Sequence, residues 1–133
     1  MSERKFQQWF VKEWEAAGMW VENIHPSFGT KTGIPDLLVM AAKLLIPIEL
    51  KTGELVGESL SVSDIRPAQI RWANQFYKAG GISGLIVGVP DGKSWKLVVV
   101  KNSAWWQAKT VFEEGEFAVT NNTFSAVAHV LAQ

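Results

Sequence analysis

The stretch IPDLLVMAAKLLIPIELK, residues 34–51, decides the fold of this chain. It holds two apolar runs of strand length, residues 34–40 and 44–51, separated by a short segment that includes Ala42 and Lys43. Two apolar runs that lie a few residues apart are typical of a β-hairpin. We therefore expect two paired strands in a central sheet, with Ala42 and Lys43 in the turn between them.

Charged residues interrupt the predicted hairpin. Asp36 opens its first strand, and Glu49 and Lys51 end its second strand. Because successive side chains of a strand alternate between its faces, Glu49 and Lys51 project together, and pairing of the strands brings Asp36 alongside Glu49. Two carboxylates at close range repel or take up a proton unless a cation joins them, and oxygen ligands of this kind favour Mg²⁺ or Mn²⁺. A lone E-x-K pattern is more often an ordinary half-exposed strand with a Glu/Lys pair, so it is no evidence of a site by itself.

The pattern of the whole chain predicts an α/β domain with a mostly central sheet. Apolar residues at three- and four-residue spacing predict helices over 3–17, 67–79 and about 124–131. Further strands are expected over 19–26, 82–89 and 95–100, and loops or turns over 27–33, 90–92 and 113–116. The segment 52–64 is rich in Gly and Ser, and we expect a mobile loop there.

Length and composition exclude several classes of protein. A chain of 133 residues predicts one domain, 1–133, with a core over about 3–103 and a C-terminal extension over about 104–133. The 13 basic residues balance the 13 acidic ones, which argues against binding nucleic acid through bulk positive charge. The sequence contains no Cys, which excludes disulfides, zinc fingers and thiol nucleophiles, and its 2 His give little support to a histidine-based metal site.

Nothing in the sequence predicts a membrane or an organic cofactor as a partner. No apolar run approaches the roughly 18 residues that span a membrane, and charged residues interrupt the N-terminal apolar stretch that a signal peptide needs. We therefore expect an intracellular, cytoplasmic protein. A Gly-rich phosphate-binding loop of familiar spacing is also lacking, so a metabolite-binding domain is not expected.

Three motifs connect the hairpin to a known family: GIPDLL over 33–38, IELKTG over 48–53 and RPAQIRW over 66–72. They resemble the PD-(D/E)XK nucleases, most closely the virus-type replication–repair (VRR-NUC) branch, which occurs in phages, bacteria and structure-specific repair nucleases. The N-terminal Glu3 and Gln7 also look like the first-helix signature of that branch. The resemblance covers about residues 3–90. It implies a restriction-endonuclease-like αβββαβ core with a central mixed sheet flanked by helices, and a phage or bacterial origin.

The same resemblance implies roles for the charged residues of the hairpin. Asp36 is implied to be the central metal ligand and Glu49 the second carboxylate ligand. The backbone carbonyl of Leu50 commonly completes the protein's contribution. Lys51 is implied to position or deprotonate the attacking water, or to stabilise the charge that builds up on the phosphate. The implied cofactor is Mg²⁺, with Mn²⁺ able to replace it.

Residues outside the hairpin complete the predicted site. The resemblance implies that Gln69 orients the water or a phosphate oxygen, and that Glu3 holds a coordinated water or a second ion. Lys31, Arg66 and Arg71 are candidates for contacts with DNA. Arg66 stands at the helix-capping position, where the branch often has a small hydroxyl residue. An arginine there weakens the predicted cap but places a guanidinium next to the site.

The resemblance implies a magnesium-dependent DNA endonuclease whose products carry 5′-phosphate and 3′-hydroxyl ends. Compact members of the branch look like Holliday-junction resolvases that work as homodimers. A four-way junction has two strands to nick symmetrically, and a two-fold dimer supplies the two sites. We therefore expect branched DNA as the substrate and a homodimer as the assembly. The alternatives are a flap or duplex nuclease that works with a partner, and a non-catalytic nucleic-acid-binding module of the same fold. The complete set of charged residues favours the nuclease.

Overall fold

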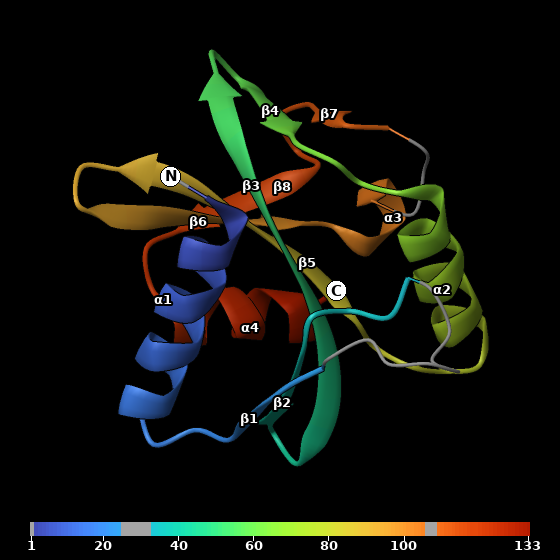
Figure 1. Ribbon diagram of the computed structural model, residues 1–133. Helices are drawn as coiled ribbons and strands as arrows, with labels where there is room; N and C mark the ends of the chain where they lie inside the picture. The colour runs from blue at the N-terminus through green and yellow to red at the C-terminus, as the bar shows by residue number, and fades with distance from the viewer. Residues whose placement is uncertain (1, 25–32, 106–108) are drawn as a thin grey trace.

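The computed structural model describes residues 2–24, 33–105 and 109–133 (Figure 1). The elements follow in the order α1 (Glu3–Ala16), β1 (Val21–Asn23), β2 (Leu37–Ala41), β3 (Leu44–Val56), β4 (Ser59–Val62), α2 (Pro67–Lys78), β5 (Gly84–Asp91), β6 (Ser94–Val100), α3 (Asn102–Trp105), β7 (Val111–Phe112), β8 (Phe117–Thr120) and α4 (Thr123–Leu131). Apart from β4, the first part of this order is the expected αβββαβ core. In the described ranges, no helix is long and apolar enough to cross a membrane.

The central sheet has the strand order β1-β2-β3-β5-β6-β8. Strands β3 and β5 run parallel, whereas the other neighbours along this path are antiparallel. A parallel pair requires a crossover connection, and α2 lies on the connection between β3 and β5. Outside this path, β4 pairs with β3 and with β7. The sheet is therefore mixed, as predicted.

Helices cover both faces of the sheet (Figure 1). On one face, Phe6, Phe10 and Trp14 of α1 are fully buried in the same cluster as Val127 and Val130 of α4. On the other face, buried residues of α2, α3, β4 and β7 form a second cluster with β5 and β6. The sheet thus lies between two apolar layers, and its strands carry side chains into both of them.

Helix α1 begins and ends where the sequence predicts. The Oγ of Ser2 accepts a hydrogen bond from the N–H of Lys5 at 3.2 Å, which satisfies one of the free N–H groups of the first turn. Gly18 follows the helix with a φ of 79°, a left-handed conformation that glycine adopts readily after a helix. Glu3 therefore stands in the first turn of a capped helix.

The hairpin of β2 and β3 forms as predicted. Ala42 and Lys43 make a two-residue turn with φ values of 51° and 65°. Positive φ at both positions is characteristic of the type I′ turn, whose twist matches that of paired strands. The register sets Leu37 opposite Ile48, so the residue before Leu37 stands opposite Glu49. This pairing confirms that the two carboxylates of the hairpin lie side by side.

The prediction of a mobile loop over 52–64 is wrong. Strand β3 continues to Val56, and β4 returns alongside it. Leu60 and Val62 of β4 are almost fully buried, and Gly57 supplies the positive φ of 62° in the turn. The Ser and Gly residues that suggested a loop lie at the turn or at less buried positions between the apolar residues. Alternation of apolar residues was therefore the better guide to this segment.

Smaller differences concern the ends of other elements. The first strand is β1, which is shorter than the predicted 19–26, and residues 25–32 lie outside the described part of the chain. Pro90 belongs to β5 and not to a turn, because β5 pairs with β6 as far as Asp91 opposite Ser94. The C-terminal region joins the core, since β8 pairs with β6 and α4 covers one face of the sheet.

Candidate active site

Strand β3 carries two charged residues into the interior of the protein. Glu49 and Lys51 lie on the same side of the strand, with only 3% and 2% of their surfaces exposed. Charged groups this deeply buried destabilise a fold unless other groups compensate them. Their neighbours are Asp36 just before β2, Glu3 in α1 and Gln69 in α2. The structure therefore brings together side chains that lie far apart in the sequence.

Asp36 is held by the backbone of both neighbouring strands. Its Oδ2 accepts a hydrogen bond from the N–H of Leu50 at 3.0 Å. Its carbonyl oxygen accepts another from the N–H of Ile24 at 2.8 Å. These bonds fix the carboxylate next to the peptide that follows Glu49, where the sequence analysis expects it.

Glu49 has one oxygen engaged by the protein and one without a protein partner. Its Oε1 accepts a hydrogen bond from Nε2 of Gln69 at 2.8 Å. Its Oε2 is buried and finds no hydrogen-bond partner among the described residues. Leaving a carboxylate oxygen buried and unpaired is costly, so this atom is well suited to bind a cation or a proton.

The electrostatics of the site favour a proton on Glu49 in the absence of metal. Burial, together with the negative charge of Asp36, raises the pKa of Glu49 to about 9, although Lys51 opposes the change. Burial also raises the pKa of Glu3, again against the effect of Lys51. Glu49 is therefore protonated at neutral pH, and a cation that binds both carboxylates must displace this proton.

Lys51 lies between two carboxylates. Its Nζ is 3.7 Å from Oε1 of Glu3 and 3.7 Å from Oε1 of Glu49. Glu3 belongs to the first turn of α1, and 40% of its side chain is exposed, so it lies at the open side of the site. The structure thus brings Glu3 to the predicted site as an ion-pair partner of Lys51.

Gln69 connects the first turn of α2 to Glu49. Its Oε1 accepts a hydrogen bond from the N–H of Arg66 at 2.9 Å, which is one half of a capping box. Because this bond occupies Oε1, the amide presents Nε2 to Glu49. The motifs place Gln69 at the site, but they do not indicate its hydrogen bond to the N–H of Arg66. A glutamine at the third position of a helix is the pattern that could have indicated it.

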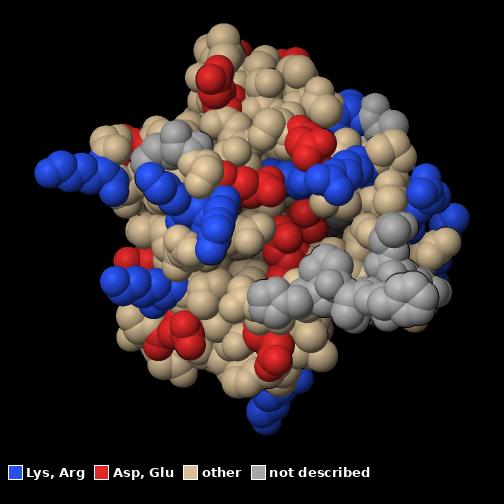
Figure 2. Space-filling model, in the orientation of Figure 1, with Lys and Arg blue, Asp and Glu red and all other residues tan. Residues whose placement is uncertain are grey.

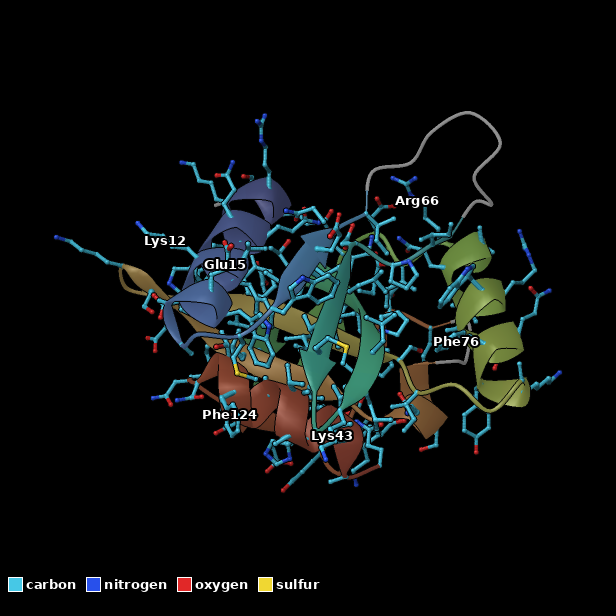
Figure 3. The ribbon with its side chains drawn as sticks, turned by 90° about the horizontal axis from the view of Figure 1, so that it is seen from below. Lys12, Glu15, Lys43, Arg66, Phe76 and Phe124 are labelled. Atoms are coloured by element: carbon cyan, nitrogen blue, oxygen red, sulfur yellow. The ribbon has the colours of Figure 1, made fainter. Side chains whose placement is uncertain are left out.

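Two of the predicted DNA-binding residues lie at helix α2, Arg66 just before its first residue and Arg71 within it. The side chain of Arg66 is 68% exposed (Figure 3), and its Nη2 lies 3.4 Å from Oδ2 of Asp64. Arg71 is exposed on α2, whereas Lys31 lies outside the described residues. Figure 2 shows acidic side chains near the middle of this face, with basic side chains on either side of them. The basic groups thus flank an acidic centre.

A polar pocket of about 490 Å³ opens at the β3–β4 hairpin, beginning at Thr52, the residue after Lys51. Its lining comes from β3, β4, the segment after β4 and the end of β5, and consists of Thr52, Gly53, Glu54, Ser61, Ser63 and Pro90. The Oγ of Ser63 donates a hydrogen bond to the carbonyl of Thr52 at 3.0 Å, which joins the two sides of the β3–β4 hairpin there. The composition of this segment predicts a loop, and a pocket between paired strands could therefore not be expected from it.

The residues present fit a hard divalent cation. Asp36 and Glu49 offer carboxylate oxygens, and the carbonyl of Leu50 is the next oxygen along β3. Within the described ranges, no group of three or more His, Cys, Asp or Glu side chains is placed to hold an ion. The two carboxylates of Asp36 and Glu49 suit Mg²⁺, which usually keeps several waters and binds through one or two carboxylates.

Comparison with known proteins supports the fold. No family model matches the chain, and no curated protein matches its sequence significantly. Among solved structures, the chain is similar to Hjc, a Holliday junction resolvase from the archaeal hyperthermophile Archaeoglobus fulgidus. The TM-score is 0.50 and the sequence identity is 17%, and the match covers 71% of this chain and 74% of that one. This likeness shows a restriction-endonuclease-like α/β fold, as the motifs imply.

Proposed function

We propose that this protein is a metal-dependent DNA endonuclease of the VRR-NUC branch of the PD-(D/E)XK superfamily, and that it cuts branched DNA. The observation that carries the proposal is the pair Glu49 and Lys51, buried in β3 with Asp36 beside them. Apolar residues at positions 49 and 51 would stabilise the sheet at least as well, so stability alone does not explain a buried charged pair, and a functional role does. The motifs support the reaction, and the fold similarity to a resolvase supports the substrate class.

Asp36, Glu49 and the carbonyl of Leu50 would hold Mg²⁺, with Mn²⁺ as a substitute. When bound, the ion polarises the phosphodiester and lowers the pKa of a water molecule. Oε2 of Glu49, which has no partner among the described residues, is the oxygen best suited to bind it. The hydrogen bond from Gln69 to Oε1 holds the carboxylate in one orientation.

Lys51 would act on the reacting phosphate. Its Nζ belongs to the same cluster as the carboxylates and is 3.7 Å from oxygens of both Glu3 and Glu49. From there it can donate hydrogen bonds to the phosphate oxygen on which charge develops, or position the attacking water. Glu3 holds the side chain of Lys51 in place. Hydrolysis leaves a 5′-phosphate and a 3′-hydroxyl, as the family resemblance implies.

DNA would lie across the acidic centre, with basic residues on either side in contact with its phosphates. Lys31, Arg66 and Arg71 are the candidates for these contacts. A domain of 133 residues offers little surface for reading a long sequence, so the shape of the DNA is the expected determinant of specificity. A four-way junction has two strands to nick symmetrically, and we therefore propose a two-fold homodimer.

Purified protein is tested on labelled four-way junction, flap and linear duplex DNA, with Mg²⁺ and with EDTA. We expect paired symmetric nicks in the junction with Mg²⁺ and no nicks with EDTA. Lys51→Ala serves as the control for contaminating nucleases and should produce no nicks. Cleavage of flap or duplex DNA instead would support the nuclease activity and contradict the proposed junction substrate. Binding without cleavage in both Mg²⁺ and Mn²⁺ would favour the non-catalytic module.

A further inference from the structure

Gly33, three residues before Asp36, packs directly against the first turn of α2. Its φ is 85°. A Cβ at this position would overlap the carbonyl group of Ala68 and lie 2.9 Å from the backbone nitrogen of Gln69. These atoms belong to one peptide of the α2 backbone, so no rotation of a side chain can relieve the overlap. Any side chain at position 33 must therefore push this peptide, or the segment that leads to Asp36, out of place.

The peptide that Gly33 contacts carries the residue that holds Glu49. The backbone nitrogen of Gln69 is part of it, and the side chain of Gln69 is anchored to the N–H of Arg66 at 2.9 Å. From this anchored position, Nε2 donates to Oε1 of Glu49 at 2.8 Å. Protein hydrogen bonds of this type extend to about 3.2 Å, so a movement of the first turn by less than about 1 Å breaks the bond.

We propose that Gly33 is a positioning residue for Glu49. The absence of a side chain lets the backbone before β2 and the backbone of α2 touch. This contact sets the place from which Gln69 orients the Glu49 carboxylate. The inference rests on the proposed metal site, because the consequence of a correctly oriented carboxylate is tighter binding of the ion. A glycine with a purely structural role would change the stability of the protein and leave its intrinsic affinity for metal unchanged.

The first test compares Gly33→Ala with Gly57→Ala. Gly57 also has a positive φ, 62°, but a Cβ added there meets no atom within 4 Å. Both variants therefore carry the backbone penalty of a left-handed alanine, and only Gly33→Ala carries the overlap with α2. Affinity for Mn²⁺ alone is measured by titration calorimetry without DNA. We expect Gly33→Ala to bind Mn²⁺ about 10-fold more weakly and Gly57→Ala to bind it like the wild type, since partners that orient a ligand contribute about 10- to 100-fold.

A double-mutant cycle tests whether Gly33 acts through Gln69. Gln69→Ala alone should also weaken Mn²⁺ binding about 10-fold. When both positions are changed, we expect a loss close to that of Gln69→Ala alone, because the bond that Gly33 supports is already gone.

The outcomes separate this inference from the proposed function. If the wild type binds Mn²⁺ and Gly33→Ala binds it equally well, the inference is wrong and the nuclease proposal stands. Independent losses that multiply to about 100-fold in the double variant would also overturn it. So would a Gly33→Ala protein that fails to fold where Gly57→Ala folds, because Gly33 would then be a requirement for folding. A wild type that binds no Mn²⁺ would overturn the metal site and the inference together.

Discussion

Replacing Glu49 with Gln should remove much of the pH dependence of stability in the metal-free protein. The pKa of Glu49 is raised from 4.5 to about 9 by burial and by Asp36. The folded state therefore binds the proton more tightly than the unfolded state does. The stability that this contributes is fully present below about pH 4.5 and is lost as the pH rises through about 9.

Between these limits, unfolding releases one proton from Glu49. The free energy of unfolding of the wild type should then fall by about 1.4 kcal/mol per pH unit, or about 3 kcal/mol from about pH 6 to about pH 8. Gln at position 49 carries no charge at either pH and keeps an oxygen that accepts the bond from Gln69. Glu49→Gln should therefore match the wild type only below about pH 4.5, and exceed it by about 2 kcal/mol near pH 6 and by about 5 kcal/mol near pH 8. Glu3 titrates in both proteins and leaves this difference largely unchanged.

Urea unfolding in EDTA, followed by fluorescence of the 7 Trp residues, measures both proteins at about pH 6, 7 and 8. Added Mg²⁺ should stabilise the wild type most at high pH, because the ion then competes less with the proton, and it should stabilise Glu49→Gln much less. If the two proteins lose stability in parallel as the pH rises, Glu49 is not the group that titrates. The description of the site would then be wrong.

Three further substitutions test other parts of the structure. Lys51→Ala should slow DNA cleavage by at least about 100-fold, while its affinity for DNA in a gel shift stays within a few-fold of that of the wild type. Loss of the circular dichroism of the folded state would instead show that Lys51 has a structural role. Lys43→Gly relieves a φ of 65° and should raise the free energy of unfolding in urea by about 0.5–1 kcal/mol, whereas no gain would argue against strain in this turn. Ser83 has a buried Oγ without a hydrogen-bond partner among the described residues. Ser83→Ala should therefore leave the free energy of unfolding unchanged or raise it by up to about 1 kcal/mol. A fall of similar size would show that the hydroxyl group is hydrogen-bonded.

The hairpin and its charged residues could be predicted because local rules determine them. Two apolar runs and a short turn specify the pairing of β2 with β3, and the alternation of side chains then places Glu49 and Lys51 together. The register follows from the two-residue turn at Ala42 and Lys43. The local sequence of residues 34–51 is therefore enough to predict that Asp36 lies beside Glu49.

Contacts between distant segments could not be predicted in the same way. The bond between Gln69 and Glu49 depends on where α2 packs, and the contact of Gly33 with Ala68 depends on the same placement. Strand β4 was missed for a related reason, since its Ser and Gly content resembles a loop and its pairing with β7 spans about fifty residues. Motifs identify which residues belong to the site, whereas the packing of elements decides how they hold one another.

The most direct test of the proposed metal site is single-turnover cleavage of a labelled four-way junction by the wild type and by Asp36→Asn, measured across a titration of Mg²⁺. The proposed metal site predicts that the wild type cuts at a rate that rises with Mg²⁺ and falls to zero in EDTA. Asp36→Asn should bind the junction as well as the wild type but cut it at least about 100-fold more slowly at every Mg²⁺ concentration, since it lacks a carboxylate that holds the ion. Cleavage by Asp36→Asn at a rate near that of the wild type, or by the wild type in EDTA, would contradict the assignment of this site.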